Sequence, residues 1–256
     1  MTALGGARNS AQGYFRASRS PRYSFLFAFP LLLAYEGLAL YLPRSETHGY
    51  RVGAEVIMRS VFDVVGGGWG AAAFGAVMIG WAGFLVVRDM RANGKPDRAS
   101  MYVRMILESV VLAFALGMSA GLLTNRVVNA LQLLRATGTR STAVDVPTQL
   151  MLSLGAGVFE ELLFRVVLVS VLIALSYIIL GTGPKMSAAI AVILSALIFS
   201  GYHYIGSGGD HFAWASFIDR AIGGLLLNLV YVLRGFGIAA WSHSLYDVGV
   251  LLLLGK

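Results

Sequence analysis

Two adjacent glutamates and an arginine interrupt a long apolar stretch, and this feature constrains the fold more than any other. Glu160, Glu161 and Arg165 lie within six residues, and long apolar runs flank them on both sides. A charge in hydrocarbon costs about 2.5–3.5 kcal/mol on insertion scales, so ionisable residues in such segments usually serve a function. Later apolar segments carry His203 and His243. The sequence therefore predicts that polar side chains from several membrane helices form one site.

The composition predicts an all-α, multi-pass transmembrane helical bundle. Hydrophobic residues make up 57% of the 256 residues and charged residues only 13%, whereas soluble domains carry about 25% charged residues. The abundant glycine is typical of helices that approach each other closely in lipid. The chain contains no cysteine, which excludes disulfides, thiol catalysis and cysteine-ligated metals.

Seven apolar segments are close to or above the length of about 20 residues that crosses a bilayer core. They cover residues 24–43, 69–87, 105–124, 147–181, 186–204, 212–233 and 236–254. We expect seven to eight spans in a single integral-membrane domain at residues 24–254, after a basic amino-terminal segment at residues 1–23. A cleaved signal peptide is the alternative for the first span, but the apolar run is long and no clear cleavage site closes it.

The distribution of basic residues predicts the orientation of the chain. The segments on the amino-terminal side of the predicted spans hold 11 Lys and Arg, and those on the opposite side hold 7. The positive-inside rule then places the amino terminus in the cytoplasm, in a membrane of the bacterial inner or plasma type. Because the basic residues cluster in short segments between apolar runs, the net charge of +7 indicates membrane topology and no nucleic-acid partner.

Other charged residues lie in or beside the apolar segments. A stripe recurs every four residues between the first two spans and consists of Arg51, Glu55, Arg59 and Asp63. It predicts an amphipathic helix that lies in the membrane interface. Glu36 and Glu108 lie inside predicted spans, where they either line an internal cavity or pair with Arg220. Asp219 and Arg220 form a local or interhelical pair in this interpretation.

The spacing of the ionisable residues suggests a division of roles. Glu161 and Arg165 share a helix face and can form a buried ion pair, whereas Glu160 points about 100° away and is free to face a cavity. His203 beside Glu160 would help to deprotonate a water molecule. His243 could donate to the oxyanion of a tetrahedral intermediate. Interhelical hydrogen bonds are the purely structural interpretation of the same residues.

Three motifs together resemble the CPBP family of intramembrane proteases, which includes the type II CAAX prenyl endopeptidases, also called Abi-type proteins. The motifs are Glu160-Glu161-x-x-x-Arg165, Phe199-x-x-x-His203 and His243-x-x-x-Asp247. The resemblance covers residues 147–254. It implies a helical bundle and a metal-independent glutamate mechanism without a cofactor. By motif position, Glu160 and His203 would activate water, and His243 and Asp247 would form the oxyanion site.

The residue at position 247 departs from the pattern of the prenyl endopeptidases, which typically carry asparagine there. An ionised aspartate cannot donate to an oxyanion. Asp247 is therefore either protonated and a donor, or it orients His243 by accepting its other N–H; we expect the donor role. The departure also argues against a prenylated CAAX substrate.

The sequence thus predicts an intramembrane endopeptidase whose partners are the lipid bilayer and a membrane-anchored protein or peptide substrate. Carboxy-terminal processing or sorting of surface proteins is one such role. The alternative is a non-enzymatic membrane protein, such as an immunity factor or a transporter. A zinc protease is a third option, but the His-Glu-x-x-His motif of intramembrane zinc proteases is absent from the sequence.

Overall fold

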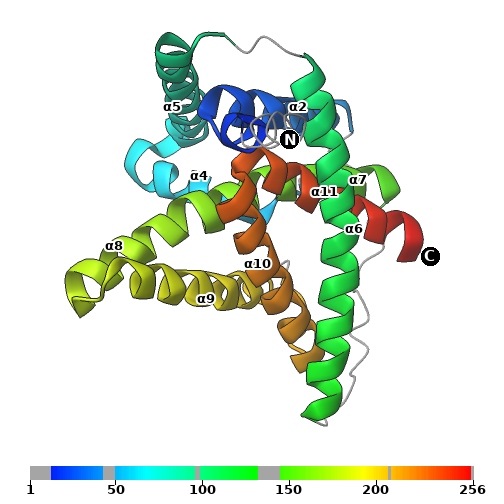
Figure 1. Ribbon diagram of the computed structural model, residues 1–256. Helices are drawn as coiled ribbons and strands as arrows, with labels where there is room; N and C mark the ends of the chain where they lie inside the picture. Colours follow the sequence, from blue (N-terminus) through cyan, green and yellow to red (C-terminus); the bar gives the residue numbers. More distant parts are fainter. Residues whose placement is uncertain (1–12, 43–49, 96–98, 132–144, 207–208, 255–256) are drawn as a thin grey trace, which may run out of the picture.

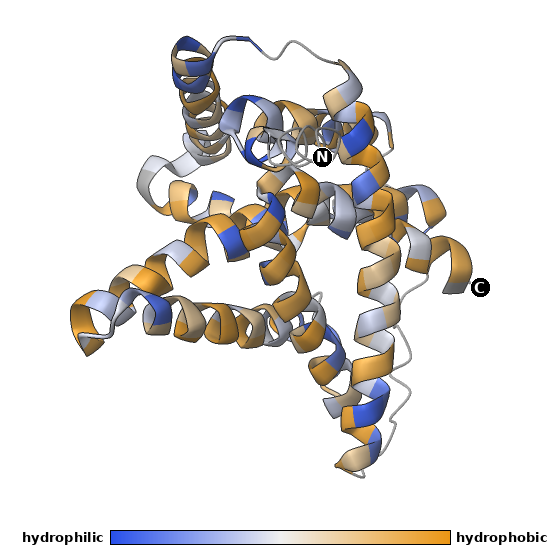
Figure 2. Cartoon of the chain, in the orientation of Figure 1, coloured by the Kyte–Doolittle hydropathy of each residue, from blue (hydrophilic) through white to orange (hydrophobic). Residues whose placement is uncertain are grey.

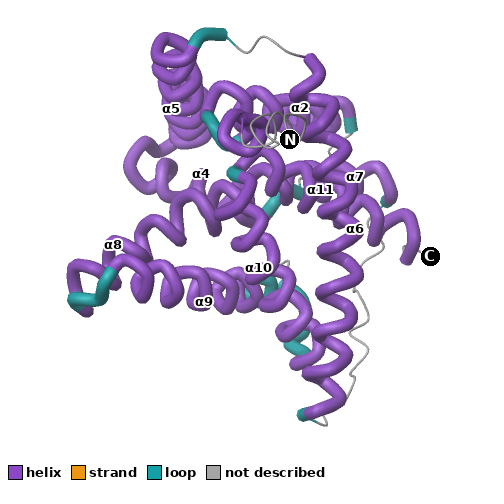
Figure 3. Tube along the Cα trace, in the orientation of Figure 1, coloured by secondary structure: helices purple, strands orange, loops and turns teal. Residues whose placement is uncertain are grey.

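The computed structural model describes residues 13–42, 50–95, 99–131, 145–206 and 209–254, and within these ranges it contains helices and no β-strand (Figure 3). The elements are α2 (Pro21–Tyr41), α4 (Gly53–Gly66), η1 (Gly67–Trp69), α5 (Gly70–Asn93), α6 (Ala99–Ala130), α7 (Val146–Glu160), the π-helix η2 (Glu161–Leu168), α8 (Val169–Leu180), α9 (Pro184–Tyr202), α10 (Trp214–Arg234) and α11 (Phe236–Leu254). The predicted all-α class is confirmed.

Seven helical segments in the described ranges are long and apolar enough to cross a membrane, as the sequence predicts. The largest shift in bounds concerns α6, which extends the predicted 105–124 to Ala99–Ala130, because a helix can continue through polar residues beyond the hydrocarbon. The fourth segment is one continuous helical run, Val146–Leu180. Figure 2 shows mostly hydrophobic helices, with hydrophilic residues at the upper end of α5 and the lower ends of α6 and α10.

Helix α11 packs against α2, α6, α7, α10 and the π-helix η2. The run α7–η2–α8 folds back into α9 through a tight hairpin, and α9 packs along α10 (Figure 1). Helices α4 and α5 pack on each other and on the α2–α7 side of the bundle. The fold therefore brings η2, α9 and α11 together, the three elements that carry the sequence motifs.

Two glycines of α7 allow its neighbours to approach closely. A Cβ on Gly157 would collide with the Ser244 hydroxyl and the Ala240 carbonyl of α11. A Cβ on Gly155 would collide with the ring of Tyr35 on α2. Small residues at such contacts let helix backbones approach in lipid, where van der Waals packing drives association. These contacts set the position of the end of α7, where the two glutamates lie.

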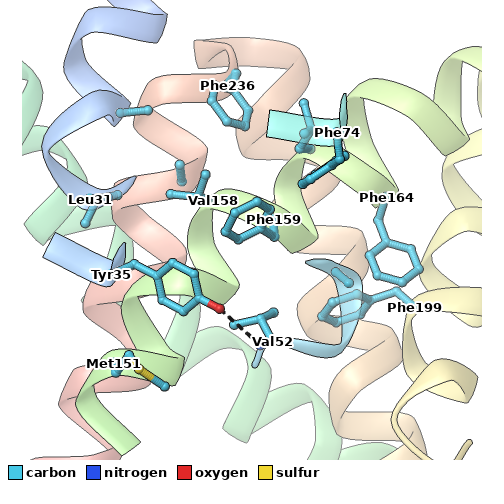
Figure 4. Packing of buried hydrophobic residues seen from close by; sticks show 14 of the residues in the cluster. Leu31, Tyr35, Val52, Phe74, Met151, Val158, Phe159, Phe164, Phe199 and Phe236 are labelled. Atoms are coloured by element: carbon cyan, nitrogen blue, oxygen red, sulfur yellow. Dashed lines mark hydrogen bonds between the residues drawn. The ribbon is translucent and has the colours of Figure 1, made fainter. Parts of the chain in front are cut away.

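An aromatic cluster surrounds this end of α7 (Figure 4). The ring centroid of Phe159 lies 5.4 Å from that of Tyr35 and 6.3 Å from that of Phe74. Phe164 and Phe199 meet edge to face, with centroids 5.2 Å apart. The glutamates are thus adjacent to a dry aromatic environment.

Three of the four residues of the charged stripe around α4, Arg51, Glu55 and Arg59, make ion pairs within the protein, whereas Asp63 is exposed. Glu55 is fully buried and hydrogen-bonded by the Tyr35 hydroxyl, and it pairs with Arg59 and, at 3.6 Å, with Arg51. A buried carboxylate needs such partners because its own desolvation is costly. The exposed residues of α4 include four large apolar side chains, Val56, Ile57, Val61 and Val64.

The other intramembrane acids find partners that the sequence does not predict. Glu36 pairs with Arg51 at 2.9 Å, and Glu108 accepts a 2.8 Å hydrogen bond from Arg234. Pairing with Arg220, one of the two predicted roles of these acids, is not what the structure shows, because Arg220 pairs with Asp210. The sequence gives the position of each acid along its own span but not the neighbouring helix that supplies its cation.

Asp219 and Arg220 do not form the predicted local pair with each other. Arg220 pairs with Asp210, and Asp219 accepts a 2.9 Å hydrogen bond from Thr124 of α6. Adjacent residues on a helix point about 100° apart, so each side chain of this pair reaches a different partner.

Candidate active site

The two glutamates lie where α7 changes into a π-helix. Glu160 is the last residue of α7, and Glu161 begins η2. Helix α9 contributes a polar contact here, because the Ser195 hydroxyl donates to the Phe164 carbonyl at 3.0 Å. π-helical segments are rare and occur frequently at functional sites.

Glu161 holds two partners at once. The predicted pair with Arg165 forms, with 3.3 Å between Oε2 and Nε, and the other oxygen, Oε1, contacts Nδ1 of His243 at 2.8 Å. The guanidinium group of Arg165 also lies over the ring of Phe199, 4.5 Å from its centroid. Glu161 and Arg165 are essentially inaccessible to solvent. This pair therefore fixes the imidazole of α11 against η2.

Glu160 is held more loosely than Glu161. The Tyr202 hydroxyl donates to Oε1 over 3.4 Å, and Nε2 of His243 lies 3.8 Å from Oε2. Ordinary hydrogen bonds to a carboxylate measure about 2.5–3.0 Å from a hydroxyl and 2.7–2.9 Å from a charged nitrogen. Glu160 thus combines deep burial, with 6% of the residue exposed, and long contacts to its protein neighbours.

The two nitrogens of His243 face different acids. Glu161 occupies Nδ1, while Nε2 faces Asp247 at 3.5 Å as well as Glu160. The sequence leaves two roles open for Asp247, a protonated donor, which we expect, or a group that orients the imidazole. The structure gives the short contact to Glu161, and Asp247 lies on the same side of the ring as Glu160.

His203 lies directly after α9 and beside the cluster. Its Nδ1 contacts the Phe199 carbonyl at 2.8 Å, so a neutral ring with the proton on Nδ1 leaves Nε2 as an acceptor. Burial, followed by the nearby charge of Arg220, lowers the pKa of His203 to about 4. The Phe199 ring lies between the two imidazoles, 4.9 Å from His203 and 6.2 Å from His243.

Tyr202 is the site residue that the sequence interpretation missed. Its hydroxyl contacts Glu160 and also abuts the first residue of α4, where a Cβ on Gly53 would lie 2.5 Å away. The one available signal was its position immediately before His203, at the end of an apolar span. A buried tyrosine at such an end usually has a partner for its hydroxyl.

The fold therefore joins five of the six predicted site residues by direct contacts: Glu160, Glu161, Arg165, His243 and Asp247. His203 meets this group through the Phe199 ring. Among the residues that the structure describes, no group of three or more His, Asp and Glu side chains has an arrangement suited to a metal ion. The arrangement brings together proton acceptors and donors from three membrane helices.

Comparison with protein families gives a match over the carboxy-terminal part of the chain. Residues 142–249 match the family described as type II CAAX prenyl endopeptidase Rce1-like. The matched region contains η2, α9, α10 and most of α11, and all six predicted site residues lie in it. No curated protein and no solved structure matches the chain.

Proposed function

We propose that this chain, whose residues 142–249 match the Rce1-like type II CAAX prenyl endopeptidase family, hydrolyses a peptide bond near the membrane-embedded part of a protein substrate. The family is one of peptide hydrolases, and the seven apolar segments are those of an integral membrane protein. The observation that carries the proposal is the loosely held, buried carboxylate of Glu160 between a phenol and an imidazole.

Glu160 acts as the general base in this proposal. Its carboxylate takes a proton from a water molecule while the water oxygen attacks the peptide carbonyl carbon. The neutral Nε2 of His203 orients this water by accepting its second hydrogen. The proton held by Glu160 then passes to the leaving nitrogen as the C–N bond breaks, and the products are a carboxylate and an amine.

His243 stabilises the oxyanion of the tetrahedral intermediate. Preorganised donors in a dry site stabilise developing charge strongly. The contact of Glu161 with Nδ1 holds the ring so that Nε2 faces the same side as Glu160. A protonated Asp247 would add a second donor on this side, which agrees with its distance of 3.5 Å from Nε2. Arg165 keeps Glu161 in place.

The proposed mechanism uses no metal ion. We expect turnover by the purified protein to survive prolonged treatment with a strong chelator. Loss of turnover in chelator, restored by zinc and not by magnesium, would establish a metal-dependent mechanism instead.

The decisive experiment compares cells that carry the chain with cells that carry Glu160→Gln. Mass spectrometry of peptides from membrane and surface proteins should reveal new carboxy or amino termini that depend on Glu160. Farnesylated and unmodified forms of one CAAX peptide, incubated with the purified protein, distinguish the prenylated substrate class from others. Identical termini in both cell types would favour the non-enzymatic alternative.

A further inference from the structure

We infer that Arg220 of α10 is a positioning residue for His203: paired with Asp210, it holds the end of α9 in place and keeps the imidazole uncharged. The clamp consists of Arg220 and Asp210, and it rests on contacts between described residues of α9, α10 and the segment that joins them. The use of the uncharged ring to orient a water molecule rests on the proposed function.

His203 lies at a place where a helix ordinarily favours a positive charge. It is the C-cap of α9, and the unsatisfied carbonyl groups at the carboxyl end of a helix stabilise cations. Its Nδ1 contacts one carbonyl of this last turn, that of Phe199, at 2.8 Å. A protonated imidazole is a donor at both nitrogens, so Nε2 could then not accept a hydrogen from water. The proposed role of His203 therefore needs a nearby group that opposes the effect of the helix end.

Arg220 supplies such a group and contacts two neighbours of His203. Its guanidinium lies over the ring of Tyr204, the next residue in the chain, 5.2 Å from the ring centroid. It also pairs with the carboxylate of Asp210, whose backbone N–H donates to the His203 carbonyl at 2.9 Å. Burial, followed by the charge of Arg220, lowers the pKa of His203 to about 4. The ring is thus neutral at pH values where hydrolysis is expected.

Packing between α9 and α10 sets the position of Arg220. The Ser200 hydroxyl, in the last turn of α9, donates to the Phe217 carbonyl in the first turn of α10 at 2.6 Å. The ring centroids of Phe217 and Tyr204 lie 6.3 Å apart. Residues three apart share a helix face, so Phe217 and Arg220 both face Tyr204. The charge beside His203 is therefore held by the packing of two helices and not by the ion pair alone.

The charged and titratable groups around His203 act on it in different directions. They are Asp210 in the joining segment, Arg220 on α10, the adjacent Tyr202 on α9, and, beyond the rings of Phe199 and Tyr202, His243 on α11, Arg165 on η2 and Glu160 on α7. Arg220 lowers the pKa of His203 more than His243 does, whereas Asp210 raises it. Loss of either charge of the clamp breaks the same ion pair, but the two losses should change the pKa of His203 in opposite directions.

A histidine titration tests the clamp without any substrate. The ring of His203 would be followed by NMR in detergent, with His203→Gln to identify its signal among the four histidines. Arg220→Gln should raise the pKa of His203 by about 1–2. Arg220→Lys, which keeps the charge, and Asp210→Asn should not raise it. An unchanged pKa in Arg220→Gln, or an equal rise in Asp210→Asn, would overturn the assignment, whatever the activity of the chain.

The pH dependence of turnover connects the clamp with the proposed reaction. Dividing the turnover rate of Arg220→Gln by that of the unchanged protein cancels the ionisations that both proteins share. This ratio should fall by about 2–10-fold from about pH 7.5 to about pH 5, because the raised pKa leaves less neutral His203 at the lower pH. The ratio for Asp210→Asn should stay level.

Two outcomes separate the clamp from the reaction. An Arg220→Gln ratio that is reduced equally at every pH would show that Arg220 only supports packing, and it would overturn the inferred role. If His203 titrates as expected but the unchanged protein hydrolyses no peptide, the proposed hydrolysis fails while the effect of Arg220 on His203 stands.

Discussion

Two buried carboxylates, Glu55 and Glu160, differ in the way their surroundings hold them. Glu55 receives a hydrogen bond from the Tyr35 hydroxyl and is paired with Arg51 and Arg59, which lie one turn away on either side of it. Glu160 has a phenol at 3.4 Å and an imidazole nitrogen at 3.8 Å, and both partners come from other helices.

This difference indicates that Glu55 stabilises the fold, whereas Glu160 is available to react. One oxygen of Glu55 accepts a hydrogen bond from a phenol and the other is ion-paired with two guanidinium groups, so its charge is compensated within the fold. Glu160 is buried without short contacts, and a buried group in this state is a poor contributor to stability. Groups of this kind are candidates for function, because strain and incomplete pairing persist where a site needs them.

The largest expected effect is on the turnover rate and tests whether Glu160 and Glu55 differ in function. Glu160→Gln should reduce the turnover rate by about 10²–10⁴-fold, because it removes the base while keeping the size and shape of the side chain. Glu55→Gln is the matched control, since it makes the same chemical change in the other buried carboxylate. Turnover of one peptide substrate, measured for both purified variants, checks this prediction. Near-normal rates for Glu160→Gln would show that the base is assigned to the wrong residue.

The next effect is on the free energy of unfolding, and it compares the ion pair of Glu161 with those of Glu55. Glu161→Gln leaves the buried Arg165 without its counter-charge, and breaking a buried pair in this way costs about 3–5 kcal/mol. Glu55→Gln should cost less, about 1–3 kcal/mol, because the side chains of Arg51 and Arg59 remain 27% and 30% exposed and keep some hydration. Unfolding of each variant in detergent measures both values. Equal losses would mean that the two acids are equivalent in the fold.

A smaller effect on turnover tests the role of Asp247. Because Glu161 holds Nδ1 of His243, the orientation of the ring does not depend on Asp247. Asp247→Asn should therefore keep most of the turnover, since the amide is also a donor. Asp247→Ala should lose about 10²-fold, as the removal of an oxyanion donor typically does. If the two variants are equally inactive, Asp247 is not a donor.

The sequence predicts the spans well because each depends on local composition. The seven apolar segments and the pair Glu161–Arg165 follow from hydropathy and from helical spacing within one segment. The orientation of α4 does not follow in this way. Its charged stripe predicts an amphipathic helix but not the partner of each charge. Glu55 receives a hydrogen bond from the Tyr35 hydroxyl on α2, and only the tertiary structure reveals such a partner.

The contacts within the site are likewise not predictable from the sequence. The motifs single out six residues, yet the short contact of His243 to Glu161 and the tyrosine beside Glu160 are interhelical. The π-helical turn at Glu161 is also invisible to a period of 3.6 residues. The sequence therefore predicts which groups take part in the site, whereas helix packing decides which groups touch.

The smallest expected effect concerns Tyr202, which links the two carboxylate regions by touching both Glu160 and the start of α4. Tyr202→Phe removes one hydrogen bond from Glu160 and keeps the ring. A neutral hydrogen bond contributes about 0.5–1.5 kcal/mol, so we expect kcat to fall by about 2–10-fold with KM unchanged. Tyr204→Phe is the matched control, since the Tyr204 hydroxyl bonds Ser216 at 2.5 Å and does not belong to the site.

A second substitution separates positioning by Tyr202 from a general loss of packing. Gly53→Ala places a Cβ within 2.5 Å of the Tyr202 hydroxyl, so it should displace that hydroxyl from Glu160 and lower kcat to a similar extent. In the Tyr202→Phe background the hydroxyl is already absent, and Gly53→Ala should then have little further effect on kcat. Such non-additivity identifies groups that act through one contact, whereas independent effects multiply. Multiplying losses, or losses that follow the fall in unfolding temperature, would show that Tyr202 only supports the packing of α4.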